Sequence, residues 1–386
     1  MAVLGAASAA AALLHEHRLR MVLRADGRGL TAVESLPRRA SQAHRVLVGR
    51  TTQQALALLP SLFPLSAMAH RSACAAALAT LQRRACAAGD EAMTRALLLE
   101  RLREHLLPLH REWPLCMAVA PSQQILQAID QGTRGTNIAR AEPGRHDTLR
   151  ELVETNSLGM PAGRFLQIDS AAALHDWARD HQHLAPARFF HWLWAQPLAL
   201  RRVELPPALP RIEAGQLAPR LLGDAGEAFE AAPQWESLCR ETGPWAQQWP
   251  HPLLRDLARP GGEAAALLLG RFAAWLLELA QAFLDWVEAS DAPDAVQAAD
   301  GCALVRTARG TLAHAVAVDT GGRITRCAIL APAQWNFHPL GTASQMLGAI
   351  AWTTPRQVAQ TASLVACAID PFVRCDFALP EVAAAR

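Results

Sequence analysis

The sequence predicts a mainly helical α+β protein with two small antiparallel β-hairpin sheets. Hydrophobic residues make up 51% of the 386 positions and charged residues 19%, a balance typical of globular proteins. Ala and Leu dominate and Tyr is absent, which favours helices over sheets. We expect a single domain over residues 1–386, with sub-regions at 17–117, 118–260 and 262–378, the middle one carrying few clear signals.

Two segments have the pattern of a hairpin. In the first, residues 20–24 alternate between polar and apolar, a turn follows at 26–29, and residues 30–36 return. In the second, strands are expected at 303–306, 312–318 and 324–330, the last two joined by the turn Asp319-Thr320-Gly321-Gly322. Together they give the two small sheets.

Helical patterns account for much of the remainder. Thr51 is suited to cap a helix whose apolar stripe Pro60 and Pro64 interrupt. A helix at 90–107 has Asp90 as its cap and is expected to stop at Pro108. Further helices are expected at 67–88, 187–195, 262–289 and 355–367.

Charge and cysteine spacing exclude several classes of function. The net charge of +2, with both signs interspersed, leaves no electrostatic footprint for nucleic acid. The eight cysteines include no C-x-x-C pair, which argues against a zinc ribbon or a disulfide framework and favours a reducing cytoplasm.

Two apolar segments could suggest a membrane. The segment at 1–14 lacks the basic start of a signal peptide. The apolar stretch at 264–287 contains Arg271, Glu278 and Asp285, so it is expected to be a buried helix and not a membrane span.

The most informative segment lies at residues 369–377 and begins with Asp370-Pro371. It resembles the C-terminal metal motif of nickel–iron hydrogenase large subunits, D-P-C-x-x-C-x-x-H. The second cysteine of that motif is present as Cys375. Phe372 stands at the first cysteine position and Ala378 at the histidine position.

Three further segments resemble the same family in the same order. Residues 44–50 and 65–70 are similar to L-x-G-R followed by R-I-C-G-x-C-x-x-x-H, and the two cysteine positions fall on Ser66 and Ala69. Residues 308–314 look like P-R-G-x-L-x-H, and residues 330–336 are similar to V-P-[ST]-T-W-N. The match is colinear at both ends of the chain and covers about half of it.

The resemblance implies a hydrogenase large-subunit-like fold without its catalytic centre. The family holds nickel and iron with four thiolates, of which this chain keeps only Cys375, at a position that bridges the metals in the family. Soft thiolates are what give such a site its nickel affinity. We therefore expect no nickel, no hydrogen turnover and no enzymatic activity.

The pattern of losses resembles the HupK/HoxV-type accessory proteins of hydrogenase maturation. That resemblance implies a cytoplasmic scaffold that holds or relays the Fe(CN)2(CO) fragment before it enters the catalytic large subunit. Cys375 would bind the iron, and Arg309 would donate hydrogen bonds to its cyanide ligands. Ala333 replaces the family's other cyanide donor. The partners implied are HypC/HypD-type chaperones and the immature large subunit, with neither nucleic acid nor membrane.

Other interpretations of these residues stay open. Cys375 could be a core cysteine, and Arg309 could bond backbone carbonyls instead of a ligand. Cys74 could offer a second thiolate but suits the core of an Ala-rich helix, and His70 could be a ligand or a structural histidine. Glu16 matches the family's proton-relay glutamate in a short segment.

Two alternative functions follow from these ambiguities. One is a pure protein-interaction chaperone for the immature large subunit that binds no metal. The other is an unrelated enzyme with Cys375 or Cys74 as nucleophile. For the scaffold we expect the segment at Asp370 to fold back against residues 65–75, because the family places its two cysteine motifs face to face.

Overall fold

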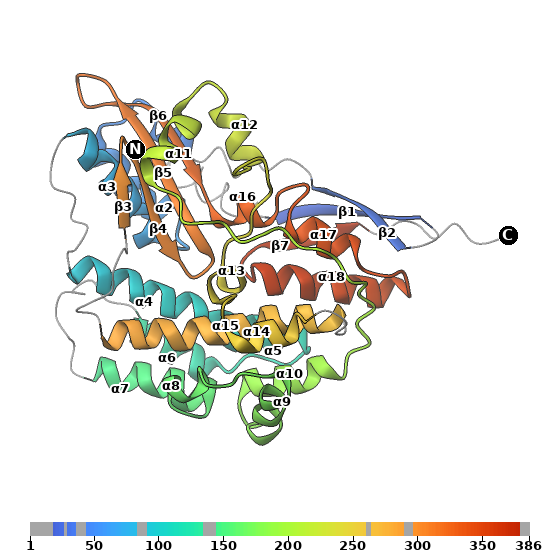
Figure 1. Cartoon of the computed structure of the whole chain (residues 1–386). Helices are drawn as coiled ribbons and strands as arrows, with labels where there is room; N and C mark the ends of the chain where they lie inside the picture. Colours follow the sequence, from blue (N-terminus) through green and yellow to red (C-terminus); the bar gives the residue numbers. More distant parts are fainter. Residues whose placement is uncertain are drawn as a thin grey trace.

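A long buried helix organises the molecule. The computed structural model describes residues 18–26, 29–35, 44–82, 91–133, 144–259, 264–288 and 296–378. Helix α15 (Ala264–Val287) runs beside α4 (Glu91–Leu107) through the middle of the protein (Figure 1). It is long and apolar enough to cross a membrane, but most of its apolar stretch is buried inside the protein, as expected of a core helix.

Charged side chains in α15 follow one face. Arg271, Glu278 and Asp285 are each seven residues apart, and seven residues make close to two helical turns. Arg271 pairs with Glu241, whereas Glu278 and Asp285 both face Arg101 of α4. The expectation of a buried helix is therefore met by ion pairs that satisfy its charges.

The remaining helices include α7 to α10, which lie on one side of this pair in Figure 1. Their bounds are α2 (Thr52–Leu62), α3 (Ala67–Leu81), α5 (Trp113–Cys116), α6 (Gln123–Thr133), α7 (Arg145–Arg150), α8 (Ala162–Phe165), α9 (Ala171–Asp180), α10 (Ala185–Trp194), α11 (Ala214–Leu222), α12 (Gly226–Ala231), α13 (Pro244–Gln248), α14 (Pro252–Leu257), α16 (Pro332–Asn336), α17 (Thr342–Gly348) and α18 (Pro355–Ile369). Two π-helical segments, Pro108–Glu112 and Glu151–Leu158, follow α4 and α7.

Two predictions about prolines need correction. Thr51 caps α2 in a capping box with Gln54, as expected, but the helix continues through Pro60 to Leu62. Pro108 ends α4 without ending the helical path, because a π-helical turn continues it into α5. Proline is accepted there because it opens the new turn, where its missing N–H is least needed.

The larger sheet confirms the second predicted hairpin and adds one strand. Strands β3 (Val296–Ala299), β4 (Cys302–Thr307), β5 (Gly310–Val318) and β6 (Ile324–Leu330) pair antiparallel in that order. Side chains alternate between its faces, as the two-residue period requires. Ala303 and Val305 pack towards α3, and Cys302 and Leu304 towards α11.

The smaller sheet contains a strand that the sequence did not indicate. Strands β1 (Arg18–Asp26) and β2 (Gly29–Ser35) form the expected antiparallel hairpin. Strand β7 (Arg374–Ala378) joins it parallel to β1, so the sheet is mixed and has the order β2-β1-β7. The β1–β2 ribbon extends away from the helical body in Figure 1. A five-residue strand made only by distant pairing has little local signal.

Candidate functional site

Arg309 lies where three distant segments meet. It occupies the tight turn between β4 and β5, and its side chain is 11% exposed. Its Nη2 donates to Ser66 Oγ at 3.3 Å, and its Nη1 lies 3.4 Å from Asp370 Oδ2. Ser66 precedes α3 and Asp370 caps the C-terminus of α18. The Asp370 and Ser66 segments are thus linked through one guanidinium group.

The bonds to Arg309 are long for charge-assisted ones, which are usually about 2.7–2.9 Å. Its Nε is buried and has no acceptor among the residues that the structure describes. A buried donor without a partner costs about 1–3 kcal/mol. Arg101 and Arg271 also have a buried Nε without a partner among these residues, but each makes a short ion pair, so the long bonds of Arg309 are what distinguish it as a cation that could receive a ligand.

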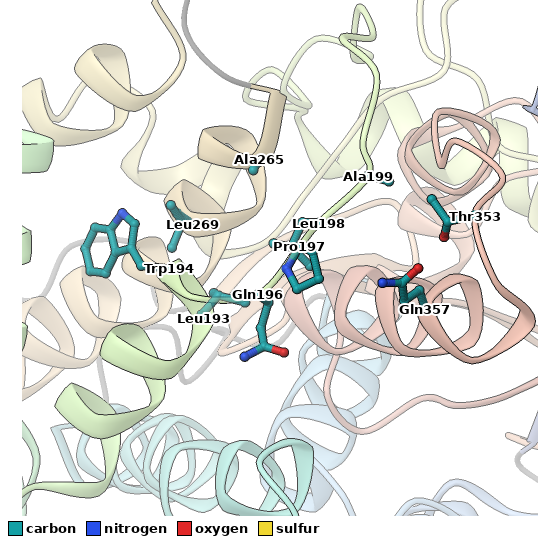
Figure 2. A pocket seen from close by; sticks show the side chains of 10 residues that line it. All are labelled: Leu193, Trp194, Gln196, Pro197, Leu198, Ala199, Ala265, Leu269, Thr353 and Gln357. Atoms are coloured by element: carbon teal, nitrogen blue, oxygen red, sulfur yellow. The ribbon is translucent and has the colours of Figure 1, made fainter.

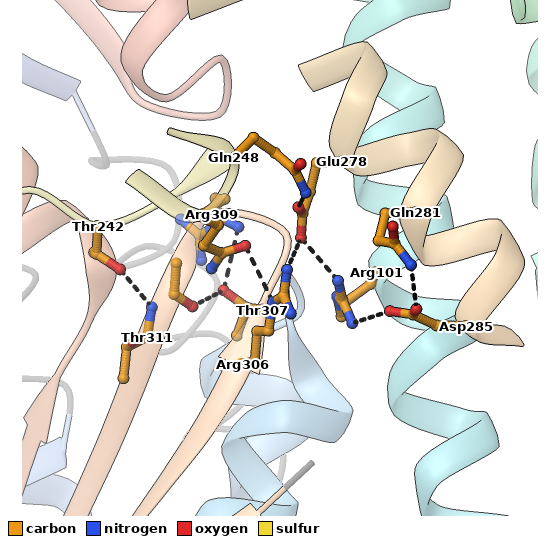
Figure 3. Close-up of polar contacts among 12 residues, drawn as sticks. Arg101, Thr242, Gln248, Glu278, Gln281, Asp285, Arg306, Thr307, Arg309 and Thr311 are labelled. Atoms are coloured by element: carbon orange, nitrogen blue, oxygen red, sulfur yellow. Dashed lines mark hydrogen bonds and ion pairs between the residues drawn. The ribbon is translucent and has the colours of Figure 1, made fainter. Parts of the chain in front are cut away.

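The backbone around Arg309 is closely packed. Gly310 has a φ of +128°, and a Cβ there would lie 2.5 Å from Thr242 Oγ1. Thr242 Oγ1 in turn accepts from the backbone N–H of Thr311, a contact drawn in Figure 3. The backbone N–H of Arg309 donates to Thr307 Oγ1. The turn is therefore fixed by its own bonds before any ligand is present.

Two glutamates occupy the side of α4 that faces the lost cysteine positions. Ser66 Oγ donates to Glu104 Oε1 at 2.8 Å, and Glu104 is almost fully buried. Glu100 accepts from the backbone N–H groups of Met68 and Ala69 at 2.7 and 2.9 Å. A carboxylate at the N-terminus of α3 suits the positive end of the helix dipole.

Burial dominates the electrostatics of this acidic pair. It raises the pKa of Glu100 to about 7, with Glu104 as the next cause. Burial also raises the pKa of Glu104, and the nearby Arg309 acts in the opposite direction. Around neutral pH the Glu100 carboxyl can therefore take up or release a proton next to the first turn of α3.

The C-terminal motif starts at this site and then leaves along β7. The backbone N–H of Phe372 donates to Asp370 Oδ1 at 3.0 Å, which holds the chain in a tight turn after α18. Cys375 lies on β7 opposite Leu19 of β1, is half-buried, and packs against the main core. Its Sγ lies 3.9 Å from the carbonyl oxygen of Val373.

The histidine and cysteine candidates on α3 are buried. His70 Nδ1 lies 2.9 Å from His314 Nε2, and the His70 ring stacks on Phe63. Burial lowers the pKa of His70 well below its ordinary value and that of His314 to about 3. Burial raises the pKa of the fully buried Cys74 thiol to about 12, which favours the core interpretation of this residue.

The other candidate positions are more dispersed. Ala378 ends β7 opposite Val22, and Ala333 is buried in α16. Glu16 lies outside the described residues. Within the described ranges, no three His, Cys, Asp or Glu side chains come together as a set that could hold a metal ion. A metal fragment that already carries ligands of its own needs fewer protein ligands than a bare metal ion.

Sequence reasoning missed the two glutamates. Glu100 and Glu104 stand four residues apart, so they share a helix face with like charge, which is unfavourable on a helix without a compensating partner. That repulsive spacing was the signal available in the sequence. Their partners, Ser66 and the N-terminus of α3, lie more than 30 residues earlier and could not be assigned without the fold.

A second polar cluster, also shown in Figure 3, has a structural character. Glu278 accepts from Arg101 at 2.8 Å, from Arg306 at 2.6 Å and from Gln248 at 2.5 Å. Although burial opposes it, the positive charge of Arg306 and Arg101 lowers the pKa of Glu278 to about 2. One ionised carboxylate therefore ties four elements together: α15, α4, β4 and α13.

A cavity of about 470 Å³ opens at the other end of α18. Figure 2 shows its polar lining, which includes Gln196, Thr353 and Gln357, beside the ring of Trp194. Gln357 and Asp370 are 13 residues apart on or next to α18, which corresponds to roughly 20 Å along the helix axis. The cavity is therefore separate from the Arg309 site and has no charged side chain in its lining.

Solved structures of hydrogenases share this fold. No family model matches the chain. The [NiFeSe] hydrogenase of Desulfomicrobium baculatum is similar with a TM-score of 0.52 and 12% identity, over 92% of this chain and 95% of that chain. The [NiFeSe] hydrogenase of D. vulgaris Hildenborough has a TM-score of 0.51 and 14% identity, over 90% and 94%. The expected hydrogenase large-subunit-like fold is confirmed.

Curated relatives then define the family. The hydrogenase expression/formation protein HupK of Azotobacter vinelandii is 32% identical over 332 residues, which cover 84% of this chain and 87% of that protein. HoxV of Cupriavidus necator, with the same description, is 31% identical over 358 residues, 87% and 90% of the two chains. This chain belongs to the HupK/HoxV family of hydrogenase expression/formation proteins.

Proposed function

We propose that this chain is an accessory scaffold in [NiFe] hydrogenase maturation that holds or relays the Fe(CN)2(CO) fragment before its insertion into the catalytic large subunit. The names of its relatives support the maturation role. The single observation that carries the finer proposal is Arg309, a buried cation with long bonds and an unpartnered Nε beside Asp370. HypC/HypD-type chaperones and the immature large subunit would be its partners.

The chemistry of the cargo fits this cation. Iron-bound cyanide presents a nitrogen that accepts hydrogen bonds, and a guanidinium offers a permanent charge with fixed donors. The bonds of Arg309 to Ser66 and Asp370 are long enough to be exchanged for shorter ones to a ligand. Cys375, on the strand that follows Asp370, would supply the thiolate.

The same site is unsuited to nickel. Three of the four positions that hold cysteine in the catalytic family are Ser66, Ala69 and Phe372 here, and none of these side chains offers a soft ligand. Ser66 is moreover bonded to Glu104, and the backbone N–H of Ala69 to Glu100. A scaffold of this kind would release its iron fragment without completing a nickel–iron centre, and we infer that it is not itself a hydrogenase.

Infrared spectroscopy on protein purified from its own host tests the proposal. We expect bands of iron-bound cyanide and carbon monoxide in the unaltered protein, and their loss in Cys375→Ser and Arg309→Gln. Cys116→Ser and Arg326→Gln are matched controls that should keep the bands, because Cys116 bonds Cys367 and Arg326 bonds the Gly223 carbonyl oxygen, and neither bonds Arg309. Circular dichroism would verify that each variant folds.

Two outcomes would separate the candidate functions. If a chaperone-bound sample of the unaltered protein shows no such bands, the iron scaffold is excluded. If host hydrogenase still requires the protein but matures normally with Cys375→Ser and Arg309→Gln, the chain acts as a protein-interaction chaperone that binds no metal.

A further inference from the structure

Two thiols from distant parts of the chain meet at the edge of the main core. Cys116 is the last residue of α5, and Cys367 lies in the last turn of α18. Their side chains are hydrogen-bonded to each other, and the Cys367 thiol is the donor. Both residues are half-buried and pack against the main core. Two adjacent thiols are the arrangement from which a disulfide can form.

The end of α5 fixes the backbone at Cys116. The N–H of Val119 donates to the carbonyl oxygen of Pro114 at 2.9 Å, and Ala118 between them has a left-handed φ of 57°. These are the marks of a Schellman motif, which closes a helix with defined geometry. Leu115 is 54% exposed and Val119 is 42% exposed, so this helix end lies at the surface. A small reactant can therefore approach the half-buried Cys116.

The end of α18 is anchored as well. Trp275 Nε1, from the buried helix α15, donates to the carbonyl oxygen of Ala368 at 3.0 Å. The backbone N–H of Asp370 donates to the carbonyl oxygen of Ala366 at 2.9 Å. Cys367 thus lies in a turn that is held from two sides. The contact between the two thiols is set by two fixed helix ends, and not by two mobile side chains.

The hydrogen bond makes the two thiols unequal. It lowers the pKa of Cys116, although burial and the negative charge of Glu112 oppose this effect. It also raises the pKa of Cys367 well above its ordinary value, and burial acts in the same direction. Burial alone raises the pKa of Cys302, in the core, to about 12. Within the pair, Cys116 is therefore the sulfur that more readily becomes a thiolate.

We propose that Cys116 and Cys367 form a redox-active dithiol that closes to an intramolecular disulfide, with a low-molecular-weight disulfide as the oxidant. The Cys116 thiolate attacks one sulfur of the oxidant, a mixed disulfide forms, and the first thiolate leaves. The sulfur of Cys367 then gives up its proton, attacks Cys116 and expels the second thiolate. Two protein thiols are oxidised, and the oxidant is reduced to two thiols that take up the two protons.

Closing the pair would join the end of α5 to the last turn of α18 by a covalent bond. In a reducing compartment such a pair rests as two thiols and closes only when the surroundings become more oxidising. The hydrogen bond to Cys116 is the largest cause of the raised pKa of Cys367, so Cys367 ionises more easily once the Cys116 thiolate has reacted. The inference is independent of the proposed iron site.

Oxidised glutathione and peptide-level mass spectrometry test the pair in the folded full chain. We expect a peptide pair linked through Cys116 and Cys367, with no glutathione retained on either residue, and its loss after reduction with dithiothreitol. Cys239→Ser is the matched control, because it removes another half-buried cysteine and should leave the cross-link unchanged. If Cys116 keeps glutathione, or if no such cross-link forms in the unaltered protein, the proposal is wrong.

Two serine variants test the separate roles. Cys367→Ser should trap glutathione on Cys116, because the sulfur that completes the exchange is missing. Cys116→Ser should gain glutathione on Cys367 at least about tenfold more slowly, because burial and the negative charge of Glu112 and Asp370 still raise the pKa of Cys367. Circular dichroism would verify folding, and the measurement on the unaltered protein needs no variant. Equal rates in the two variants would exclude Cys116 as the attacking thiol.

Discussion

Arg309 and Glu278 illustrate how the same fold treats two buried charges differently. Glu278 is surrounded by three donors at 2.5 to 2.8 Å, and its pKa is lowered to about 2. Arg309 has only long bonds to Ser66 and Asp370 and a buried Nε without an acceptor in the described chain. A fully paired charge holds a fold together, whereas an incompletely paired one can receive a ligand.

Replacing Glu278 should be costly. We expect Glu278→Gln to lower the free energy of unfolding by about 3–5 kcal/mol, because the buried Arg101 then keeps only the more distant Asp285 as a counterion. Urea unfolding followed by tryptophan fluorescence would measure the change. Asp285→Asn is the matched control on the same helix face; this residue is partly exposed and 3.8 Å from Arg101, so its loss should cost about 1 kcal/mol or less. Equal losses in the two variants would contradict the structural role of Glu278.

At the scale of elements, the site depends on the turn between β4 and β5. This two-residue turn, Ala308-Arg309, projects the guanidinium from a rigid antiparallel pair towards α3 and α18. Gly243 packs against it so closely that a Cβ there would lie 2.9 Å from the Arg309 carbonyl oxygen. Rigid elements, and not a flexible loop, therefore set the position of the charge.

Gly310→Ala tests that dependence. The left-handed φ of Gly310 and the 2.5 Å approach of Thr242 Oγ1 should make the variant less stable by at least about 1–2 kcal/mol and move Arg309. Thermal unfolding would measure the first effect, and loss of the infrared bands in host-purified protein the second. Gly163→Ala in α8 is the control, because a Cβ there meets nothing within 4 Å and alanine favours the helix. A Gly310→Ala variant as stable as this control would refute the packing argument.

At the scale of the whole molecule, several histidines are buried. Burial lowers the pKa of His105 and His314 to about 3 and that of His44 and His110 to about 4, from an ordinary 6.5. Below pH 6.5 these histidines bind protons in the unfolded chain but stay unprotonated in the folded chain. Stability from these groups is therefore present above pH 6.5 and is lost as the pH falls towards 3.

Buried carboxyls first oppose this loss of stability as the pH falls and then, at lower pH, add to it. Burial raises the pKa of Glu100 and Glu230 to about 7, so the folded state gains stability as the pH falls from 7 to 4.5, and nothing more below that. Glu278 has a lowered pKa of about 2, so its stabilisation is present above 4.5 and lost as the pH falls through 2. Between pH 6.5 and 4.5 the two glutamates therefore offset only part of the loss from the four histidines, and below pH 4.5 only losses remain.

We therefore expect acid unfolding to be steep between pH 4.5 and 3. Three groups, His105, His314 and Glu278, together bind about three more protons in the unfolded state there, or roughly 4 kcal/mol per pH unit. Tryptophan fluorescence during an acid titration would show it. His105→Leu should lower the midpoint pH of acid unfolding, because it removes a group that takes up a proton on unfolding. It breaks no hydrogen bond, since neither ring nitrogen of His105 has a partner among the residues described. A chain still folded at pH 2.5 would contradict the prediction.

The elements with strong local patterns could be predicted, and those made by distant contacts could not. The apolar run of α15 and the glycine turn at 319–322 can each be predicted from neighbouring residues in the sequence alone. Strand β7 has no such signal, because its pairing with β1 is what makes it a strand. The continuation of the helical path through Pro108 likewise depends on packing against distant segments, which a short stretch of sequence does not reveal.

The candidate site was predictable only where a family motif marked it. Arg309 and Asp370 were found through their motifs, and the fold brings both to Ser66. Glu100 and Glu104 belong to no motif quoted from the sequence, and a charged pair on a leucine-rich helix ordinarily faces solvent. Cys116 and Cys367 come from two helices far apart in the chain, so only the folded structure could reveal their contact.

The parallel pairing of β7 with β1 has a consequence for the order in which the protein is assembled. Cys375 and its register partner Leu19 are separated by more than 350 positions. During synthesis β1 leaves the ribosome first and has only β2 as a neighbouring strand until the more than 350 residues between Leu19 and Cys375 have followed. The thiol proposed to hold iron would thus be positioned only after those residues are made, which would keep a shorter nascent chain from taking up the iron fragment.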